Sequence, residues 1–145
     1  APDFAGLTGL TYIDLTGNSH ITPPAFTGMT VLESLLMSEN ELTTPPDLSA
    51  CSALVAVQLL NNHLTSPPLL PTGAPIQSIN LQGNALTTAG VDAVLAKLVA
   101  GTYSGELGEA FLKQTPPAIP SAAGLADRAT LLAAPRSWGI VEVDT

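Results

Sequence analysis

Cations, cysteines and aromatic residues are all scarce in this sequence of 145 residues. Its 4 Lys and Arg residues are outnumbered by 12 Asp and Glu residues, so the formal net charge at pH 7 is −8. The cations all lie after residue 96, and residues 48–91 contain no charged residue apart from the largely neutral His63. Because phosphate binding requires cations that displace counterions, this balance argues against a nucleic-acid partner.

The sequence also lacks a cysteine framework and a membrane-spanning segment. Its single cysteine, Cys51, excludes internal disulfides and a metal site built from cysteines alone. A spanning helix needs about 20 mostly apolar residues, whereas prolines between residues 67 and 75 interrupt the long uncharged run. Hydrophobic residues nevertheless make up 46% of the chain, so we expect it to fold, with a length that suits one domain.

What the sequence does contain is a repeat of 22 residues. Aligned on this interval, four segments read LTYIDLTGN, LESLLMSEN, LVAVQLLNN and IQSINLQGN. Each ends in an asparagine, and these are Asn18, Asn40, Asn62 and Asn84. Pro-Pro pairs follow at the same interval after the first three segments. Repeats of this length are typical of solenoids, in which each unit buries its apolar face against its neighbours.

The shared pattern, L-x-x-L-x-L-x-x-N-x-L, resembles that of short leucine-rich repeat proteins of bacterial or phage type. The resemblance covers residues 7–94 and implies an α/β solenoid, a right-handed superhelix with a parallel concave sheet and a Pro-containing, irregular convex side. We expect leucine-rich repeats over 1–101, with a partial repeat at 1–6, four repeats from residue 7 and a helix at 88–100 in the last. Residues 102–145 are expected to form a helix–strand C-terminal cap.

Physical reasoning from the residues leads to the same architecture. Alternate side chains of a strand face one side, which predicts a common interior for Ile13, Leu15, Leu35, Met37, Val57, Leu59, Ile79 and Leu81. Buried backbone groups must be paired, so the four asparagines are expected to form a structural ladder, bonding to the backbone and to one another. The prolines predict an extended return path without helix.

The last third of the chain predicts further elements. Residues 88–100 read as a helix with Val91, Val94, Leu95 and Leu98 on its buried face, ended by Gly101. Residues 103–108 are a plausible strand. Ser121 is expected to cap a helix that runs to about residue 134, and residues 138–144 alternate as a final strand.

Candidate catalytic and metal-binding residues are few. His20 shares a position with Leu42 and Leu64, unless Ile21 takes the core place, and His63 is expected on the surface. Cys51 aligns with apolar residues and reads as a core residue. Carboxylates such as Asp14, Glu33 and Glu39 could bind Ca²⁺ or act in acid–base chemistry, but they more simply solvate a surface. We therefore predict no enzyme, no catalytic residue, no metal site and no cofactor.

The strand residues that point away from the core form the candidate ligand-binding surface on the concave face. They are Tyr12, Asp14, Thr16, Ser34, Leu36, Ser38, Ala56, Gln58, Leu60, Ser78, Asn80 and Gln82. The leading hypothesis is a non-catalytic module that binds a protein or cell-surface glycan there. The alternative is a structural protein of a surface layer, fibre or virion appendage.

Both ends of the predicted array bear on partners and location. Residues 1–6 read as part of a repeat, which would leave Phe4, Leu7 and Leu10 uncovered. We expect upstream repeats of a longer array, or a partner subunit, to cover them. Cysteine-flanked caps and N-glycosylation sequons are absent, which favours a bacterial or phage protein displayed outside a cell or on a virion.

Overall fold

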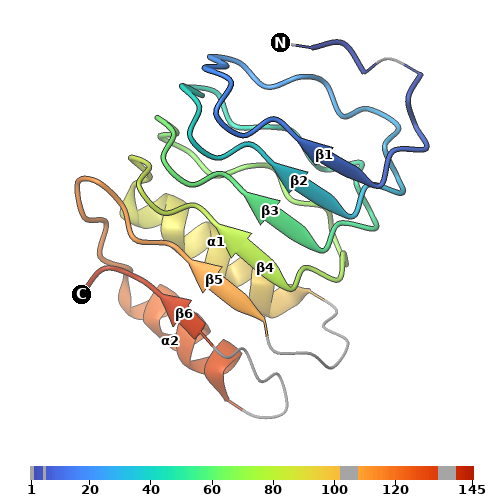
Figure 1. Ribbon diagram of the computed structural model, residues 1–145. Coiled ribbons are helices and arrows are strands. Elements are labelled where there is room, and N and C mark those ends of the chain that lie inside the picture. Colours follow the sequence, from blue (N-terminus) through green and yellow to red (C-terminus); the bar gives the residue numbers. More distant parts are fainter. Residues whose placement is uncertain (1, 5, 102–107, 134–139) are drawn as a thin grey trace.

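The chain builds one parallel sheet of six short strands in the order of the sequence (Figure 1). This computed structural model describes residues 2–4, 6–101, 108–133 and 140–145. The strands are β1 (Tyr12–Asp14), β2 (Ser34–Leu36), β3 (Ala56–Gln58), β4 (Ser78–Asn80), β5 (Glu109–Phe111) and β6 (Ile140–Glu142). The helices are α1 (Thr88–Ala100) and α2 (Ala122–Leu132). Parallel strands joined in sequence order are compatible with an α/β repeat solenoid.

The register of the sheet follows the period of the sequence. Tyr12 pairs with Ser34, and the pairing continues at intervals of 22 residues to Ala56 and Ser78. From β4 onward the interval lengthens to 31 residues, because Ser78 pairs with Glu109 and Glu109 pairs with Ile140. Each of the two longer units holds a helix, and its strand still joins the sheet in register. The change of period therefore marks a change in the return path and leaves the sheet continuous.

The return paths differ because of proline. In the first three repeats the second proline of each pair, at 24, 46 and 68, is buried, and the described return segments contain no helix, as predicted. In the fourth repeat Thr87 caps α1 by accepting the Gly90 backbone N–H. This helix buries Val91, Val94, Leu95 and Leu98. Its bounds and its buried face confirm the sequence prediction, and Gly101 is its C-cap.

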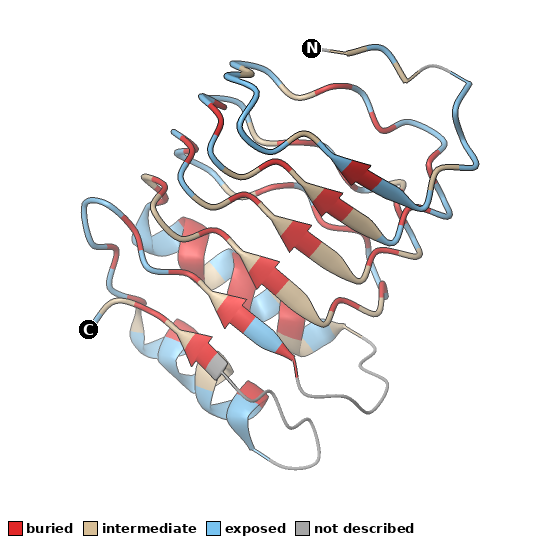
Figure 2. Cartoon of the chain, viewed as in Figure 1, coloured by how far each residue is buried: buried red, intermediate tan, exposed pale blue. Residues whose placement is uncertain are grey.

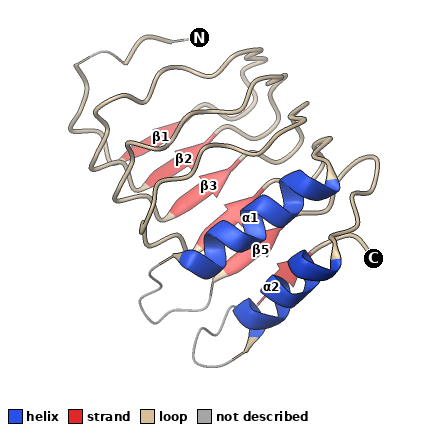
Figure 3. Ribbon diagram, turned by 180° about the vertical axis from the view of Figure 1, so that it is seen from behind, coloured by secondary structure: helices blue, strands red, loops and turns tan. Residues whose placement is uncertain are grey.

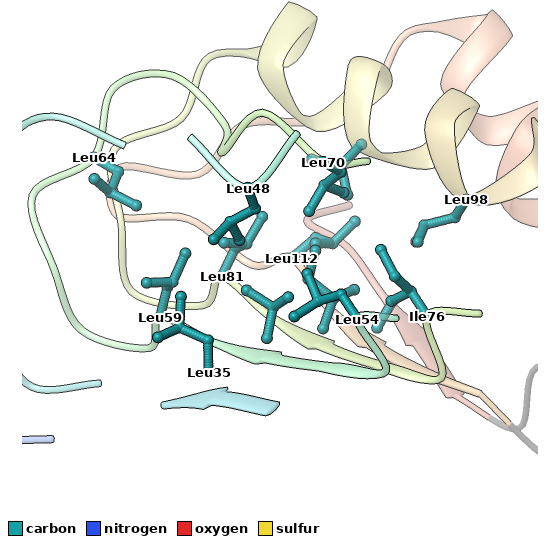
Figure 4. Packing of buried hydrophobic residues seen from close by; sticks show 14 of the residues in the cluster. Leu35, Leu48, Leu54, Leu59, Leu64, Leu70, Ile76, Leu81, Leu98 and Leu112 are labelled. Atoms are coloured by element: carbon teal, nitrogen blue, oxygen red, sulfur yellow. The ribbon is translucent and has the colours of Figure 1, made fainter. Parts of the chain in front are cut away.

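The core lies between the sheet and the return segments (Figures 2 and 4). The central residue of each of the first five strands is buried, and Val141 of β6 is buried as well. Leucines of the return segments and of α1 pack against these strand residues, with Leu48, Leu70 and Leu98 as examples (Figure 4). Of the eight interior positions predicted from alternation, seven are buried and Leu15, in the first repeat, is partly buried.

In each of the four repeats the residue just before the asparagine adopts the left-handed conformation. Gly17 and Gly83 have φ of 70°, while Glu39 and Asn61 have φ of 56° and 53°. A left-handed φ is open to glycine and tolerated by asparagine, but it strains a glutamate by about 1–2 kcal/mol.

Replacing Glu39 with glycine is therefore expected to raise the free energy of unfolding by about 0.5 to 1 kcal/mol, after allowance for the greater entropy of glycine in the unfolded chain. The reverse change, Gly83→Ala, is expected to destabilise, since a Cβ there would collide with the Asn61 side chain. Urea denaturation of both variants measures the difference. A loss of stability in Glu39→Gly would show that the glutamate side chain makes a stabilising contact.

The second helix and the last two strands correct the sequence prediction in detail. Ser121 caps α2 as expected, but the helix ends at Leu132 and Ala133 is its C-cap. The strand predicted at residues 103–108 lies almost wholly outside the described residues, and the observed strand β5 begins at Glu109. Of the predicted strand 138–144, residues 138 and 139 also lie outside them, and β6 spans Ile140–Glu142. β5 and β6 each follow the preceding strand after 31 residues, nine more than the spacing of the first four strands.

Candidate functional site

The residues predicted as a binding surface do come together on one side of the sheet. Both helices lie on the opposite side, as the two views show (Figures 1 and 3), so no described helix covers this surface. We call it the strand face. Among its members the register aligns Asp14, Leu36, Gln58 and Asn80 in one row across four strands. Thr16, Ser38, Leu60 and Gln82 follow two residues further along each chain segment and continue the face.

Several side chains of the strand face are held by local hydrogen bonds. The Thr16 backbone N–H donates to Asp14 Oδ1 at 2.9 Å, and this bond lowers the pKa of Asp14. Asn80 Oδ1 accepts the Gln82 backbone N–H at 3.0 Å in the same way. Gln58 Nε2 donates to Ser78 Oγ at 2.9 Å across two strands. These side chains are therefore positioned before any ligand arrives, which reduces the entropy that binding would lose.

Across β1 to β4 the strand face is mostly polar, with two leucines near its centre. Leu36 and Leu60 are half-buried and come from adjacent repeats, while Tyr12 at the first strand is 56% exposed. Apolar groups surrounded by small polar ones are a common arrangement at the centre of a protein interface. Neither leucine belongs to the core cluster.

Sequence reasoning missed the part of the strand face that β5 and β6 contribute. Glu109 and Phe111 take the outward positions of β5, and Glu142 takes one on β6. Lys113 Nζ lies 3.3 Å from Glu142 Oε2 in an ion pair whose side chains are 48% and 41% exposed. The segment EAFLKQ carries the same alternation as SINLQG, with Ala110 and Leu112 in the core. Alignment on Leu112, with a longer period allowed, would have found it.

The asparagines form a structural ladder that bonds to the backbone. Asn62 Nδ2 donates to the carbonyl groups of Met37 and Leu59 at 3.0 and 3.1 Å. Its Oδ1 accepts the Leu42 N–H at 3.0 Å, so the side chain joins two repeats. Asn40 and Asn84 are also buried and bond in the same manner. The expected bonds between one asparagine side chain and the next are not seen among the described residues, because the backbone groups take up the amides.

The ladder continues past the asparagines with a glutamine and then an aspartate. Gln114 is buried, accepts the Leu86 N–H and donates to the carbonyl groups of Leu81 and Leu112. It stands three residues beyond the last residue of its strand where Asn84 stands four, and its extra methylene group makes up the distance. Asp144 Oδ2 then accepts the N–H groups of Gln114 and Ala118 at 2.9 and 2.8 Å.

The first member of the ladder differs from the others. Asn18 is exposed, and its Nδ2 donates to the Thr16 carbonyl at 3.1 Å. Its backbone N–H donates to Asn40 Oδ1 at 3.2 Å, so the asparagine of the next repeat binds the backbone of the first. Within the described part of the chain no group donates to Asn18 Oδ1. The prediction of a structural ladder therefore holds for the buried positions, and Asn18 occupies its open end.

The remaining candidates for chemistry lie apart. His20 is half-buried and His63 is exposed. Ile21 does not take the core place from His20, since its side chain is 58% exposed. Glu33 and Glu39 are exposed, and Asp14 is engaged with Thr16. In the residues that the structure describes, no three His, Cys, Asp or Glu side chains are grouped so that they could hold a metal ion.

Cys51 is fully buried in the core, and its removal from water raises the pKa of its thiol, with a further contribution from the charge of Asp47. We expect this thiol to be inert toward Ellman's reagent at pH 8 in the folded protein, because the reactive species is the thiolate. In denaturant it should react at the rate of a free cysteine. The absorbance of released thionitrobenzoate measures both rates, and fast labelling without denaturant would show that the core opens at this position.

Comparison of the chain with models of protein families, with curated proteins and with solved structures found no match. A search of the described helices found none that is both long and apolar enough to cross a membrane. The functional interpretation therefore rests on the geometry of the strand face and of the ladder.

Proposed function

We propose that this chain is a leucine-rich repeat solenoid that binds a protein or a cell-surface glycan through the strand face, without catalysis. The observation that carries the proposal is the strand face itself, a continuous row of in-register, outward-facing side chains that no described helix covers. Solenoids commonly use such a surface for binding. A protein of this kind fits display outside a cell or on a virion.

Leu36 and Leu60 are the residues on which this binding is expected to depend most. Each is half-buried in the free protein, so a ligand would remove the rest of its surface from water. Complete burial of a leucine is worth about 1.5–3 kcal/mol, which leaves about 1 kcal/mol for each on binding. The polar groups around them, such as Gln58 with its bond to Ser78, would supply orientation more than affinity.

The test begins with a screen of the protein against a glycan array and a displayed peptide library. For any ligand found, Leu60→Arg is expected to weaken binding by about tenfold or more, because it places a charge at an apolar contact. Leu69→Arg is the matched control, since Leu69 is 59% exposed and lies on the return path. Both variants should keep the thermal midpoint of the wild type. Equal binding by wild type, Leu60→Arg and Leu69→Arg would contradict the strand face as the site.

The alternative function is a structural role in a surface layer, fibre or virion appendage. It is favoured by the first repeat, where Leu7 is 50% exposed and Phe4 and Leu10 are only partly buried. This hypothesis predicts concentration-dependent association in sedimentation velocity. A single species of about the mass of one chain across a wide concentration range would argue against assembly by this protein alone.

A further inference from the structure

The charge of the strand face is carried by a few side chains on its outer strands. Asp14 belongs to β1, while Glu109 and Glu142 belong to β5 and β6. Lys113 is the one cation of this face among the described residues, and its ion pair with Glu142 offsets both charges. Within the same part of the chain, neither Asp14 nor Glu109 has a cation as partner. Two carboxylates of the strand face are therefore uncompensated, and they lie on strands far apart in the sheet.

Each of these two carboxylates has an aromatic ring beside it on the same strand. Tyr12 and Asp14 are two residues apart on β1, and Tyr12 Oη donates to Asp14 Oδ2 at 3.4 Å. On β5, Glu109 and Phe111 are also two residues apart. Residues at this interval face the same side of a strand and are separated by about 7 Å along it. We call Tyr12 with Asp14 the β1 pair, and Glu109 with Phe111 the β5 pair.

A ring beside a carboxylate suits the binding of an organic cation. The face of an aromatic ring attracts an ammonium or guanidinium group that lies within about 6 Å of the ring centre. A carboxylate accepts charge-assisted hydrogen bonds from the same groups. Arginine suits both partners, because its planar guanidinium stacks on rings and binds carboxylates through two hydrogen bonds. Tyr12, Asp14 and Glu109 are exposed and Phe111 is half-buried, so a ligand can reach both pairs.

The described cations of the chain do not occupy either pair. Lys97 and Arg128 belong to α1 and α2, which lie on the opposite side of the sheet (Figure 3). Lys113 is engaged with Glu142. A cation that fills the β1 pair or the β5 pair would therefore come from a binding partner.

The distance between the two pairs defines the spacing of the cations that they would bind. The strands follow one another in the order β1 to β5 (Figure 1), so four strand spacings separate the pairs. At about 4.8 Å for each spacing, this distance is about 19 Å. An extended chain rises about 3.3 Å per residue, so about six residues cover it. Leu36 on β2 and Leu60 just after β3 lie between the pairs.

We infer that the ligand of the strand face is an extended polypeptide segment with two cationic side chains about six residues apart and apolar side chains between them. This inference rests on the proposed function of the strand face and names the class of its ligand. The cations would bind to the β1 pair and the β5 pair. Alternate side chains of an extended segment face one side, so the second and fourth residues after the first cation would reach Leu36 and Leu60.

Glycans match these groups less well than a polypeptide does. A neutral glycan has no cation for either carboxylate, and a sulfated or carboxylated glycan would be repelled by both. A cationic glycan could satisfy the carboxylates, but it lacks apolar side chains for Leu36 and Leu60. Of the two ligand classes considered for the strand face, the charges and the leucines together favour the polypeptide.

The probe for the experiment is the nine-residue peptide GRSLTLSRG, in which the two arginines are six positions apart and the leucines stand between them. GESLTLSEG is the charge control, and GRRSLTLSG is the spacing control with the same composition. Fluorescence anisotropy of the labelled peptides measures binding to the full chain at low and high salt. A chitosan oligosaccharide, added as competitor, represents the cationic glycans.

Four variants of the protein test the two pairs. Asp14→Asn removes the charge but keeps an acceptor for the Thr16 N–H, and Glu109→Gln changes an exposed side chain. Tyr12→Leu removes the ring from the β1 pair. Glu41→Gln is the matched control, because this exposed carboxylate follows Asn40 in the turn, outside the strand face. All four are expected to keep the thermal midpoint of the wild type.

We expect GRSLTLSRG to bind at least about tenfold more tightly than GESLTLSEG at low salt, with the gap narrowing as salt screens the charges. It should also bind about threefold or more above the spacing control, because adjacent arginines cannot reach both pairs. Asp14→Asn and Glu109→Gln should each weaken binding by about fivefold, and Tyr12→Leu by about threefold. Glu41→Gln should change binding by less than about twofold, since it lies outside the strand face.

The inference is overturned if the spacing control binds as tightly as GRSLTLSRG, or if Glu41→Gln weakens binding as much as Asp14→Asn, because attraction would then be nonspecific. Tighter binding of the chitosan oligosaccharide would overturn the polypeptide class. A ligand that depends on Leu60 but not on Asp14 or Glu109 would contradict this inference and leave the proposed function standing. Binding that is equal in wild type, Leu60→Arg, Asp14→Asn and Glu109→Gln would contradict both.

Discussion

Replacing Asn62 with alanine is expected to lower the free energy of unfolding by about 4 kcal/mol, whereas the same replacement at Asn18 should lower it by less than about 0.5 kcal/mol. Asn62 is buried and bonds to Met37, Leu59 and Leu42. Its removal leaves the buried Leu42 N–H without a partner, which costs about 1–3 kcal/mol. It also takes one of two amide donors from each of the Met37 and Leu59 carbonyl groups, which keep their bonds from Asn40 and Asn84, at about 1 kcal/mol for each lost bond. Asn18 is exposed, so water replaces the bond from its Nδ2 to Thr16.

Urea denaturation of the two variants and of the wild type measures the difference, and the two substitutions remove the same atoms. Asn62→Asp is a useful third variant, because it keeps an acceptor for the Leu42 N–H but loses the donors and buries a charge. We expect it to be at least as destabilising as Asn62→Ala. Similar losses at Asn18 and Asn62 would mean that the ladder acts through some property other than burial of its bonds.

The first four strands could be predicted because their information is local. The central residue of a strand such as Val57 is apolar and buried, its neighbours are polar, and the asparagine follows at a fixed distance. The 22-residue period then places each strand beside the next, and the observed register has the same interval. The first helix was equally accessible, since Thr87 and Gly101 are recognisable caps and no proline interrupts the segment.

The end of the sheet was harder to predict because the period changes there. Ala110 stands in β5 where the earlier strands have Leu, Val or Ile, which weakens the apolar signal. Gln114 replaces asparagine one residue early, so alignment on asparagine cannot detect it. The strand face was accordingly predicted without Glu109 and Phe111. Its aromatic content is higher than the first four repeats suggest.

The direction of the ladder is a property that sequence alone could not supply. Four asparagines at equal intervals look equivalent, and nothing in the pattern distinguishes Asn18 from Asn40. The distinction arises because each side-chain oxygen accepts an N–H group from the preceding repeat, so Asn18 Oδ1 has no donor among the described residues. At the other end of the ladder, Asp144 accepts the backbone N–H of Gln114. His20 shows a related effect, since its place in the core column is only half covered in the first repeat.

Asp144→Ala is expected to lower the free energy of unfolding by about 3 kcal/mol, the second-largest effect that we predict. The carboxylate accepts the N–H groups of Gln114 and Ala118, and bonds to a charged acceptor contribute about 1.5–3 kcal/mol each before solvent exposure reduces them. Loss of these bonds also frees Gln114, whose amide holds Leu86 and Leu81 in the repeat before it. The destabilisation should therefore spread inward from the C-terminal end.

Asp144→Asn separates the acceptor from the charge. An asparagine at this position keeps one side-chain oxygen for the two N–H groups, so we expect a loss of about 1 kcal/mol. The aspartate serves only as an acceptor for the two N–H groups, whereas Asn62 also needs its donors for Met37 and Leu59. Hydrogen exchange in Asp144→Ala should accelerate first at Gln114 and Ala118. If exchange accelerates uniformly along the sheet instead, the chain unfolds as one cooperative unit and Asp144 stabilises all of it equally.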